Sequence, residues 1–248
     1  MSQLRASANA LQVKPAGLPR HLAVIMDGNH RWARQRRLPG AMGHRAGARN
    51  VRPVVEACAE QGIRCLTLFA FSTENWQRPQ GEINLLMGLM RNVFENDLDE
   101  LHRREVRLRI IGDRTRFPAD LQMQMNRAES MTRRNTEVTL NIAANYGGRW
   151  DITEAARAMA RAVQAGKLDA DRIDEQVFES YLSLSPVPAP DLCIRTGGDQ
   201  RISNFLLWDF AYTEFYFTNA YWPDFDEGEL IRALGAFEER KRRFGCRE

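Results

Sequence analysis

Residues His21–Met26 read HLAVIM, and the polar segment Asp27-Gly28-Asn29-His30-Arg31 follows them directly. An unbroken apolar run of this length, ending in a turn-forming Asp-Gly pair, is typical of a buried strand. Further short apolar runs along the chain alternate with longer segments of helical spacing. This alternation indicates right-handed βαβ crossovers and a mainly parallel sheet that helices cover on both faces.

The remaining elements of this α/β fold follow from the same patterns. Further strands are expected at Cys65–Phe71, Val106–Ile111, Val138–Ala143, Leu192–Ile194 and Glu214–Phe217. Helices are expected at Ala46–Gln61, Ile83–Leu101, Leu121–Arg133, Asp151–Gln164 and Asp226–Arg243. We therefore predict a single domain with a central sheet of about six strands.

The two ends of the chain differ in what they predict. Residues 1–18 contain no acid and no apolar stretch long enough for a signal peptide or a membrane span, and we interpret them as a flexible leader. Residues 19–245 are expected to form the folded domain. Within it, Ser185–Pro190 (SPVPAP) has the composition of a loop and is interpreted as an internal connector.

The composition is that of a globular protein, with 44% hydrophobic and 27% charged residues. It excludes a disordered polymer, a collagen and a disulfide miniprotein. The formal net charge of +3 is too small to require a nucleic-acid partner. Only Lys14, Lys167 and Lys241 are lysines among the 35 basic residues, so most positive charge sits on guanidinium groups, whose forked donors suit phosphate.

The cysteines argue against a zinc site. Cys58, Cys65, Cys193 and Cys246 form no CxxC pair, and the four histidines show no HxxxH spacing. Scattered cysteines within apolar runs are interpreted as reduced core residues, which favours a cytosolic protein.

Polar loops that contain arginine follow three of the predicted strands. These loops are Asp27–Arg34 (DGNHRWAR), Ser72–Pro79 (STENWQRP) and Arg195–Asn204 (RTGGDQRISN). The carboxyl ends of parallel strands meet at one edge of a sheet, where turn N–H groups and guanidinium donors can hold phosphate. No GxxxxGK[ST] or GxGxxG pattern is present, so the two common nucleotide-binding loops are disfavoured.

A carboxylate at such an edge suggests magnesium, which takes one or two carboxylates together with phosphate oxygens and water. Asp27 is the first candidate ligand and Glu214 the second. On spacing alone an Asp-Gly pair is more often a simple turn, and a lone glutamate is more often a surface or capping residue. Trp32 and Trp76 beside arginines fit base stacking, although such tryptophans more often pack under a loop. The apolar stripe of Ile83–Leu101 is more often core than pocket.

Several longer motifs identify the chain as similar to the cis-prenyltransferase family. They are HLAVIMDGNHRWA, GHRAG, LTLFAFSTENWQRP, RLRIIGD, TLNIAANYGGRWDI, IRTGGDQRISNFLLWDFAYTEFYF and WPDF, in this order from about Pro19 to Gly245. The likeness is strongest to the bacterial long-chain members. Long motifs in a fixed order are far more specific than any single short pattern.

The resemblance implies a Mg²⁺-dependent cytoplasmic homodimer with a hydrophobic tunnel beside its parallel sheet. It implies repeated cis-condensation of isopentenyl diphosphate onto an allylic diphosphate, commonly farnesyl diphosphate. The product implied is a long-chain polyprenyl diphosphate such as undecaprenyl diphosphate, the lipid carrier of cell-wall building blocks. No nucleic acid is expected as a partner, and contact with the inner face of the plasma membrane would be peripheral, through the lipid product.

The same resemblance implies residue roles. Asp27 matches the family's essential, metal-binding aspartate, Asn75 its proposed proton acceptor, and Glu214 its second metal carboxylate. The allylic diphosphate pocket and the adjoining substrate loop correspond to Gly28, Asn29, His30, Arg31, Trp32, His44, Ser72, Thr73, Glu74, Trp76 and Arg78. The isopentenyl diphosphate site corresponds to Arg195, Arg201, Ile202 and Ser203.

Three positions depart from the family pattern. Gly40 stands where many members carry Arg or Lys to hold diphosphate. Two outcomes are open: Arg36 or Arg37 takes over this role, or the affinity for the allylic donor falls. Gln200 stands where some members carry a histidine, but its amide oxygen is still a hard donor for Mg²⁺. His30 replaces a common glycine and adds bulk beside the donor site.

The chemistry places requirements on these residues. Breaking the allylic C–O bond leaves negative charge on diphosphate, which the metal and the arginines stabilise. A neutral amide is a poor base, so Asn75 is expected to orient a relay in which diphosphate or Asp27 takes the proton. The growing apolar chain needs dry surface. We expect that wall to come from the Ile83–Leu101 stripe and from Ala70, Val106, Val138, Leu140 and Ala144.

Three other functions compete with this interpretation. A short- or medium-chain cis-prenyl diphosphate synthase would differ in product length. A non-catalytic partner subunit of the same fold would tend to lose the aspartate loop, yet DGNHRW and RISN are both intact. A single-strand nucleic-acid module is disfavoured by the acids Asp27, Glu74, Asp199 and Glu214 within the basic loops.

Overall fold

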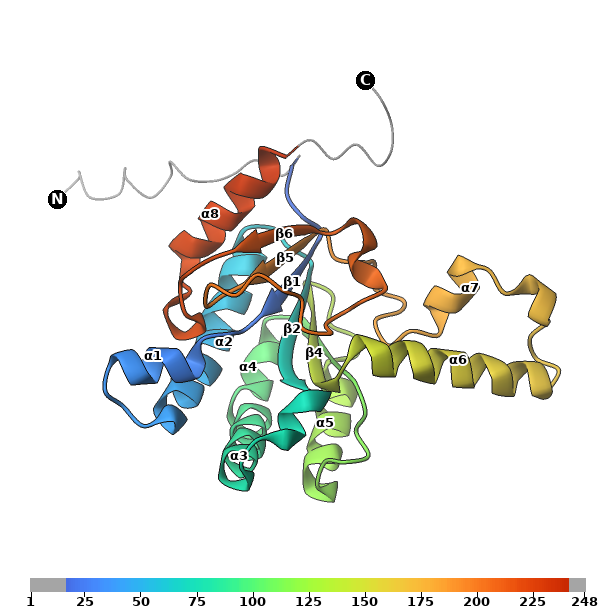
Figure 1. Ribbon diagram of the computed structural model, residues 1–248, viewed down its shortest axis with the longest axis horizontal. Helices are drawn as coiled ribbons and strands as arrows, with labels where there is room; N and C mark the ends of the chain where they lie inside the picture. The colour runs from blue at the N-terminus through green and yellow to red at the C-terminus, as the bar shows by residue number, and fades with distance from the viewer. Residues whose placement is uncertain (1–16, 241–248) are drawn as a thin grey trace.

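The structure is a computed structural model that describes residues 17–240. Its centre is one six-stranded sheet in which every neighbouring pair is parallel, in the order β3-β4-β2-β1-β5-β6 (Figure 1). The strands are β1 (His21–Ile25), β2 (Cys65–Ser72), β3 (Val106–Ile111), β4 (Val138–Tyr146), β5 (Leu192–Arg195) and β6 (Glu214–Phe217). The predicted fold class is confirmed, and all six predicted strands are present.

The central strand β1 is buried along its whole length, and its side chains divide between two cores. Leu22 and Val24 belong to a core on one face of the sheet, whereas Ala23 and Ile25 belong to a second core on the other face. Alternate residues of a strand point to opposite faces, so an uninterrupted apolar run is what a two-faced strand needs.

Helices α2, α3, α4, α5 and α8 pack on the first face, and α6 begins at the second face and runs outward toward α7 (Figure 1). The described helices are α1 (Asn29–Gln35), α2 (Gly40–Glu60), α3 (Gln80–Asn96), α4 (Leu98–Arg103), α5 (Ala119–Thr132), α6 (Gly148–Gln164), α7 (Glu175–Ser180) and α8 (Glu227–Glu238). Short 3₁₀ turns include η1 (Thr73–Gln77), η3 (Asp209–Tyr212) and η4 (Trp222–Asp224).

The helices differ from prediction in four ways. The expected helix Ile83–Leu101 is two helices, because the chain turns at Asp97 between α3 and α4. Helix α2 begins at Gly40, before the expected Ala46, and α1 and α7 were not predicted. Helix α8 ends at Glu238, and residues 241–243 of the expected closing helix, with Cys246 and residues 1–16 of the expected leader, lie outside the described residues.

Strand register brings three loops to one place. Ile25 at the end of β1 pairs with Phe69 of β2 on one side and with Arg195 of β5 on the other. The loops after β1, β2 and β5 therefore leave the same edge of the sheet side by side. Ligands of open parallel sheets bind at this edge.

Candidate active site

Asp27 leaves the end of β1 with its backbone fixed on both sides. Its backbone N–H donates to Thr196 Oγ1 at 2.9 Å. Its carbonyl oxygen accepts from Thr196 Oγ1 at 2.7 Å and from the backbone N–H of Trp222 at 3.0 Å. The next residue, Gly28, has a φ of 100°, and a Cβ there would lie 2.6 Å from the Tyr221 ring. Only glycine meets both conditions, so the turn presents the Asp27 side chain in one orientation.

The Asp27 carboxylate is paired with two arginines. Its Oδ2 accepts from Arg195 Nη2 at 2.8 Å, and its Oδ1 lies 3.2 Å from Arg31 Nη2 and accepts from the Gly28 N–H at 2.6 Å. Partial burial works against ionisation of Asp27, but the hydrogen bond and charge of Arg195, with the Gly28 N–H and Arg31, outweigh it and hold its pKa below the ordinary value. Asp27 is therefore an anion at neutral pH.

A second carboxylate, Asp199, completes the charged network. Asp199 Oδ2 lies 3.3 Å from Arg31 Nη2, 3.0 Å from Arg201 Nη2 and 3.5 Å from Arg195 Nη2. Three guanidinium groups thus face two carboxylates, and the surplus positive charge suits an anionic ligand. Asp199 was not among the predicted site residues. Its position inside an arginine-rich loop at a strand end was the signal that could have found it.

Arg195 is the most buried charge of the network, with 4% of its side chain exposed. Its Nη1 donates to Ser203 Oγ at 2.8 Å and to the Arg201 carbonyl, but its Nε has no hydrogen-bond partner among the described residues. A buried donor without a partner is costly, so the network leaves part of the hydrogen-bonding capacity of Arg195 unused.

The loops after β2 and β5 are joined across the site. Asn204 Nδ2 donates to Glu74 Oε1 at 2.9 Å. In the β2 loop, the Ser72 N–H donates to Asn75 Oδ1 at 3.0 Å, and the Ser72 side chain accepts from the Asn75 backbone. This reciprocal cap fixes the amide of Asn75 by its oxygen, which leaves the amide NH₂ as the part that can face a ligand.

Glu82 links the β2 loop to α2. Its Oε1 accepts from Arg78 Nη1 at 2.8 Å and lies 3.1 Å from His44 Nε2. Burial lowers the pKa of His44 below its usual value, although the Glu82 charge acts in the opposite direction. His44 is therefore neutral near pH 7 and serves as a hydrogen-bonding group in the wall of the site.

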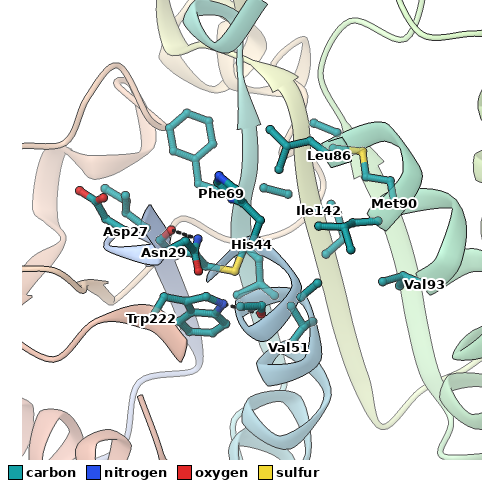
Figure 2. A pocket seen from close by; sticks show the side chains of 18 of the residues that line it. Asp27, Asn29, His44, Val51, Phe69, Leu86, Met90, Val93, Ile142 and Trp222 are labelled. Carbon is teal, nitrogen blue, oxygen red and sulfur yellow. Dashed lines mark hydrogen bonds between the residues drawn. The ribbon is translucent and has the colours of Figure 1, made fainter. Parts of the chain in front are cut away.

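These groups surround the mouth of a cavity of about 1200 Å³. Figure 2 shows Asp27 and Asn29 at one end, with Leu86, Met90 and Val93 at the other. Between the two ends, helices α2 to α5 and strands β2, β3 and β4 form the wall. Its apolar residues include Val51, Val55, Leu68, Phe69, Ala70, Leu89, Phe94, Leu101, Leu108, Ile110, Met125, Leu140, Ile142 and Ala144. The arrangement can hold a molecule with an anionic head and a long apolar body.

Most predicted site residues line this cavity. They are Asp27, Gly28, Asn29, His30, Arg31, His44, Ser72, Glu74, Asn75, Arg78, Arg195, Arg201 and Ser203. Asp199, Glu82 and Asn204 line it as well and were not predicted as site residues. Of the expected apolar wall, Ala70, Leu140 and Ala144 line the cavity, but Val106 and Val138 are buried opposite each other at the start of β3 and β4, outside the lining.

Four predicted contact residues lie behind the lining. Trp32 Nε1 donates to Asp224 Oδ1 at 2.7 Å, and Trp76 Nε1 donates to Asn145 Oδ1 at 2.8 Å. Thr73 and Ile202 are also outside the lining. The Arg36 guanidinium lies over the Trp32 ring, and the Trp76 ring packs against Phe71 and Phe117.

Glu214 is not brought to Asp27 within this chain. It is the first residue of β6 and pairs in register with Leu192, at the edge of the sheet opposite the site, and its Oε2 accepts from Arg240 Nη1 at 2.8 Å. In a parallel sheet a residue that precedes the apolar run lies at the amino-terminal edge. The expected pair of metal carboxylates is therefore not formed within one chain.

The departures Gly40 and His30 lie together. A Cβ on Gly40 would be 2.7 Å from His30 Cδ2 and 3.1 Å from His30 Nε2, so the imidazole fills the place of a side chain at position 40. His30 lines the cavity, whereas neither Arg36 nor Arg37 does. Arg36 is bonded to both carboxylate oxygens of Asp224 at 3.0 Å. The two departures are thus complementary, and the proposed arginine substitutes face elsewhere.

The donor set at Asp27 fits a magnesium ion only in company with substrate. Among residues 17–240 no group of three His, Cys, Asp or Glu side chains could hold a metal. Mg²⁺ commonly binds through one or two carboxylates, substrate phosphate oxygens and water. The anionic carboxylate of Asp27 at the mouth of a phosphate-type pocket meets that requirement, so the residues fit a metal that arrives with a diphosphate.

Comparison with known proteins gives consistent matches over nearly the whole chain. A family model described as "Putative undecaprenyl diphosphate synthase" matches residues 25–245. Ditrans,polycis-undecaprenyl-diphosphate synthase ((2E,6E)-farnesyl-diphosphate specific) from Xanthomonas axonopodis pv. citri is 54% identical over 94% of this chain and 91% of that protein. Its Escherichia coli K12 namesake is 51% identical over 94% and 92%. The crystal structure of lavandulyl diphosphate synthase from Lavandula x intermedia, in complex with dimethylallyl diphosphate, superimposes with a TM-score of 0.89 at 39% identity, covering 92% of this chain and 98% of that one.

Proposed function

The chain belongs to the cis-prenyltransferase family, and we propose that it condenses isopentenyl diphosphate repeatedly, with cis double bonds, onto farnesyl diphosphate. The product is a long-chain polyprenyl diphosphate such as undecaprenyl diphosphate, the precursor of the carrier lipid for cell-wall building blocks. One observation carries the proposal: the charged mouth opens into an apolar cavity of about 1200 Å³. Ordinary small-molecule pockets have volumes of about 300–1,000 Å³, so this cavity suits a longer chain.

The mouth offers two anion sites that share one wall. We assign the allylic diphosphate to the α1 side, where Asn29, His30 and Arg31 line the cavity, and isopentenyl diphosphate to Arg195, Arg201 and Ser203. The shared wall is the Asp27–Arg195 pair, with 2.8 Å between Oδ2 and Nη2. Two anchored diphosphates would hold the attacking double bond close to the allylic carbon, and such positioning supplies a large part of catalysis.

Charge separation is the step that the mouth stabilises. When the allylic C–O bond breaks, negative charge develops on the departing diphosphate, and guanidinium donors already fixed by Asp199 and Asp27 stabilise it. Asp27 would hold Mg²⁺ against the diphosphate, and the ion, when bound, supplies further neutralisation of the leaving group. Within one chain no second carboxylate role falls to Glu214, which is bonded to Arg240.

The proton released at each condensation goes to an acceptor that Asn75 orients. The Asn75 oxygen already accepts from the Ser72 N–H, and a neutral amide has little affinity for a proton. We therefore assign the proton to the diphosphate or to Asp27, with Asn75 as a positioning residue. An unchanged rate and pH profile in Asn75→Ala would eliminate this role. Full wild-type activity in Asn75→Asp, with a new acidic limb in its pH–rate profile, would support the relay.

We further propose a cytoplasmic homodimer that contacts the inner face of the plasma membrane peripherally through its product. Both the assembly and the location follow from the family resemblance and from the apolar nature of the product. In the part of the chain that the structure describes, no helix is both long and apolar enough to cross a bilayer.

The deciding experiment is incorporation of radiolabelled isopentenyl diphosphate with farnesyl or geranyl diphosphate as primer, with and without EDTA, read as product chain length. We expect a long product from farnesyl diphosphate and loss of incorporation with EDTA that added Mg²⁺ restores. Products that stop after one or two additions would instead show a short-chain synthase. This alternative matters because a lavandulyl diphosphate synthase shares the fold at a TM-score of 0.89.

A further inference from the structure

Helix α1, the turn after it and the first part of α2 form a helical hairpin, residues 29–52, whose charged side chains are all positive. Residues 28–55 contain seven arginines and no aspartate or glutamate. They span α1 (Asn29–Gln35) and most of α2 (Gly40–Glu60), which lie side by side at one end of the molecule (Figure 1). Gly43 of α2 touches the Asn29 carbonyl so closely that a Cβ would collide with it. The hairpin is therefore a packed unit, not a loose arm.

Four of these arginines are exposed and have no acidic partner among residues 17–240. Arg31, Arg36 and Arg52 form ion pairs with acids. No ion pair is formed by Arg34, Arg37, Arg45 or Arg49, and the side chain of each is exposed. The protein's nearly balanced composition is thus locally unbalanced, and the charge on this surface is available to an outside partner.

Apolar side chains stand among these free charges. Leu38, in the turn between the helices, and Met42, in the first turn of α2, are each 39% exposed. Arg45 Nη1 lies 4.0 Å from Met42 Sδ, so charge and apolar surface are in contact. A surface of exposed apolar residues ringed by arginines is the pattern of a segment that lies in the interface of an anionic membrane.

Other exposed large apolar residues stand in different settings. Met123 of α5 is 66% exposed, with Arg127, which forms no ion pair among the described residues, one turn further along the helix. Ile173 is 40% exposed but follows Asp169 and Asp171 and precedes Asp174, so its surroundings repel an anionic surface. Trp208 is 37% exposed and packs on Phe178 at 4.5 Å between ring centroids. The hairpin is the surface where two exposed apolar side chains and four exposed arginines without an ion pair among the described residues gather on adjacent elements.

We propose that the hairpin of residues 29–52 is a docking surface for a lipid bilayer with anionic headgroups. His30, His44 and Arg49 of the same hairpin line the cavity, so docking would place the mouth next to the membrane. This inference rests on the proposed function, because an enzyme with an apolar substrate and product gains from access to the phase into which both partition. The bilayer would then receive the chain without its crossing water.

The test is sedimentation of the full chain with vesicles, without substrates. Wild type is compared on phosphatidylglycerol–phosphatidylcholine vesicles and on pure phosphatidylcholine vesicles. The hairpin variant is Arg34→Gln/Arg37→Gln/Arg45→Gln, and its matched control is Arg127→Gln/Arg134→Gln/Arg161→Gln, which removes the same charge from exposed arginines on other elements. We expect the hairpin variant to bind anionic vesicles at least about tenfold more weakly and the control to bind like wild type.

A second variant, Leu38→Ser/Met42→Gln, separates insertion of apolar side chains into the bilayer from simple charge attraction. It should also weaken vesicle binding. Its thermal unfolding midpoint should stay that of wild type, which shows that the fold is intact. Equal binding of hairpin and control variants, or no preference of wild type for anionic vesicles, would overturn the proposal. Normal vesicle binding with a raised KM for soluble diphosphates would likewise overturn it and make the surface a guide for substrate. Because binding is read without turnover, its failure is distinct from failure of the condensation assay.

Discussion

The mouth and the apolar interior of the cavity are built on different principles. At the mouth the charged groups are held by hydrogen bonds to charged or polar neighbours: Asp27 by Arg195, Arg195 by Ser203, and Asp199 by Arg31. In the interior, α3 and the strands contribute apolar side chains, such as Leu86 and Ile142 in Figure 2, that line the cavity and can form no hydrogen bonds. Substitutions at the mouth should therefore change the rate of reaction, whereas substitutions in the interior should change what shape of product fits.

The largest effect should come from Asp27→Ala. It removes the cavity-lining carboxylate that accepts a hydrogen bond from Arg195 Nη2. This carboxylate is also the predicted metal ligand. Loss of one preorganised electrostatic group costs about 10²–10³ in kcat, and loss of a metal ligand adds to this, so we expect a fall of about a thousandfold or more. The measurement is kcat for isopentenyl incorporation.

Asp224→Ala is the matched control for this change. Asp224 also binds an arginine and an indole, Arg36 and Trp32, but lies outside the cavity lining. It should retain activity within about tenfold, since only the support of α1 is weakened. Equal losses in the two variants would show that the mouth owes its importance to folding and not to chemistry.

The interior is tested by Ala70→Leu, which adds bulk to the cavity wall at a bulged position of β2. Inserted methylenes in a packed site cost about 1–3 kcal/mol, so elongation should stop earlier and the product should be shorter, with the first condensation little affected. Val138→Ala is the control, because Val138 is buried in β4 outside the lining. An unchanged product length in Ala70→Leu would remove Ala70 from the path of the chain.

A smaller effect is expected where the mouth meets solvent. Arg201 is 63% exposed and lies 3.0 Å from Asp199, so solvent screens most of its charge. Arg201→Gln should raise the KM for isopentenyl diphosphate by about three- to tenfold with kcat nearly unchanged, as loss of uniform binding does. Arg64→Gln, an equally exposed arginine paired with Glu137 far from the cavity, should leave both constants unchanged. A fall in kcat alone would place Arg201 in the bond-breaking step instead.

Sequence alone predicted the strands better than the helices. Each strand is a short apolar run bounded by polar residues, as at Val106–Ile111, where prediction and structure agree at both ends. The break at Asp97 was missed because the apolar stripe continues from α3 into α4, so its periodicity shows no interruption. Helix α1 was missed because among its residues Asn29–Gln35 only Ala33 is buried, so it carries no apolar stripe.

The site divides in the same way. Asp27 and Arg195 follow apolar runs, and the rule for parallel sheets places both at one edge. Glu214 precedes its run, so the same rule assigns it to the opposite edge, and the resemblance to the family outweighed that signal. Side-chain pairing such as that of Asp199 with Arg31 could not be predicted, because it depends on how two loops far apart in sequence face each other.

The finest comparison is within the mouth itself, between Gly40 and His30. A Cβ on Gly40 would lie 2.7 Å from His30 Cδ2, so Gly40→Ala should push the imidazole aside. If His30 contacts the allylic diphosphate, the KM for that substrate should rise about two- to threefold with kcat unchanged. Gly88→Ala, a helical glycine with nothing within 4 Å of its added Cβ, controls for the change of residue type.

The double variant His30→Gly/Gly40→Arg replaces the imidazole at position 30 with a guanidinium at position 40, so the hydrogen-bonding group beside the allylic site comes from the other of the two positions. Recovery of the allylic KM in that variant would show that the two positions form one binding unit. An allylic KM that is unchanged in Gly40→Ala would show that His30 only fills space.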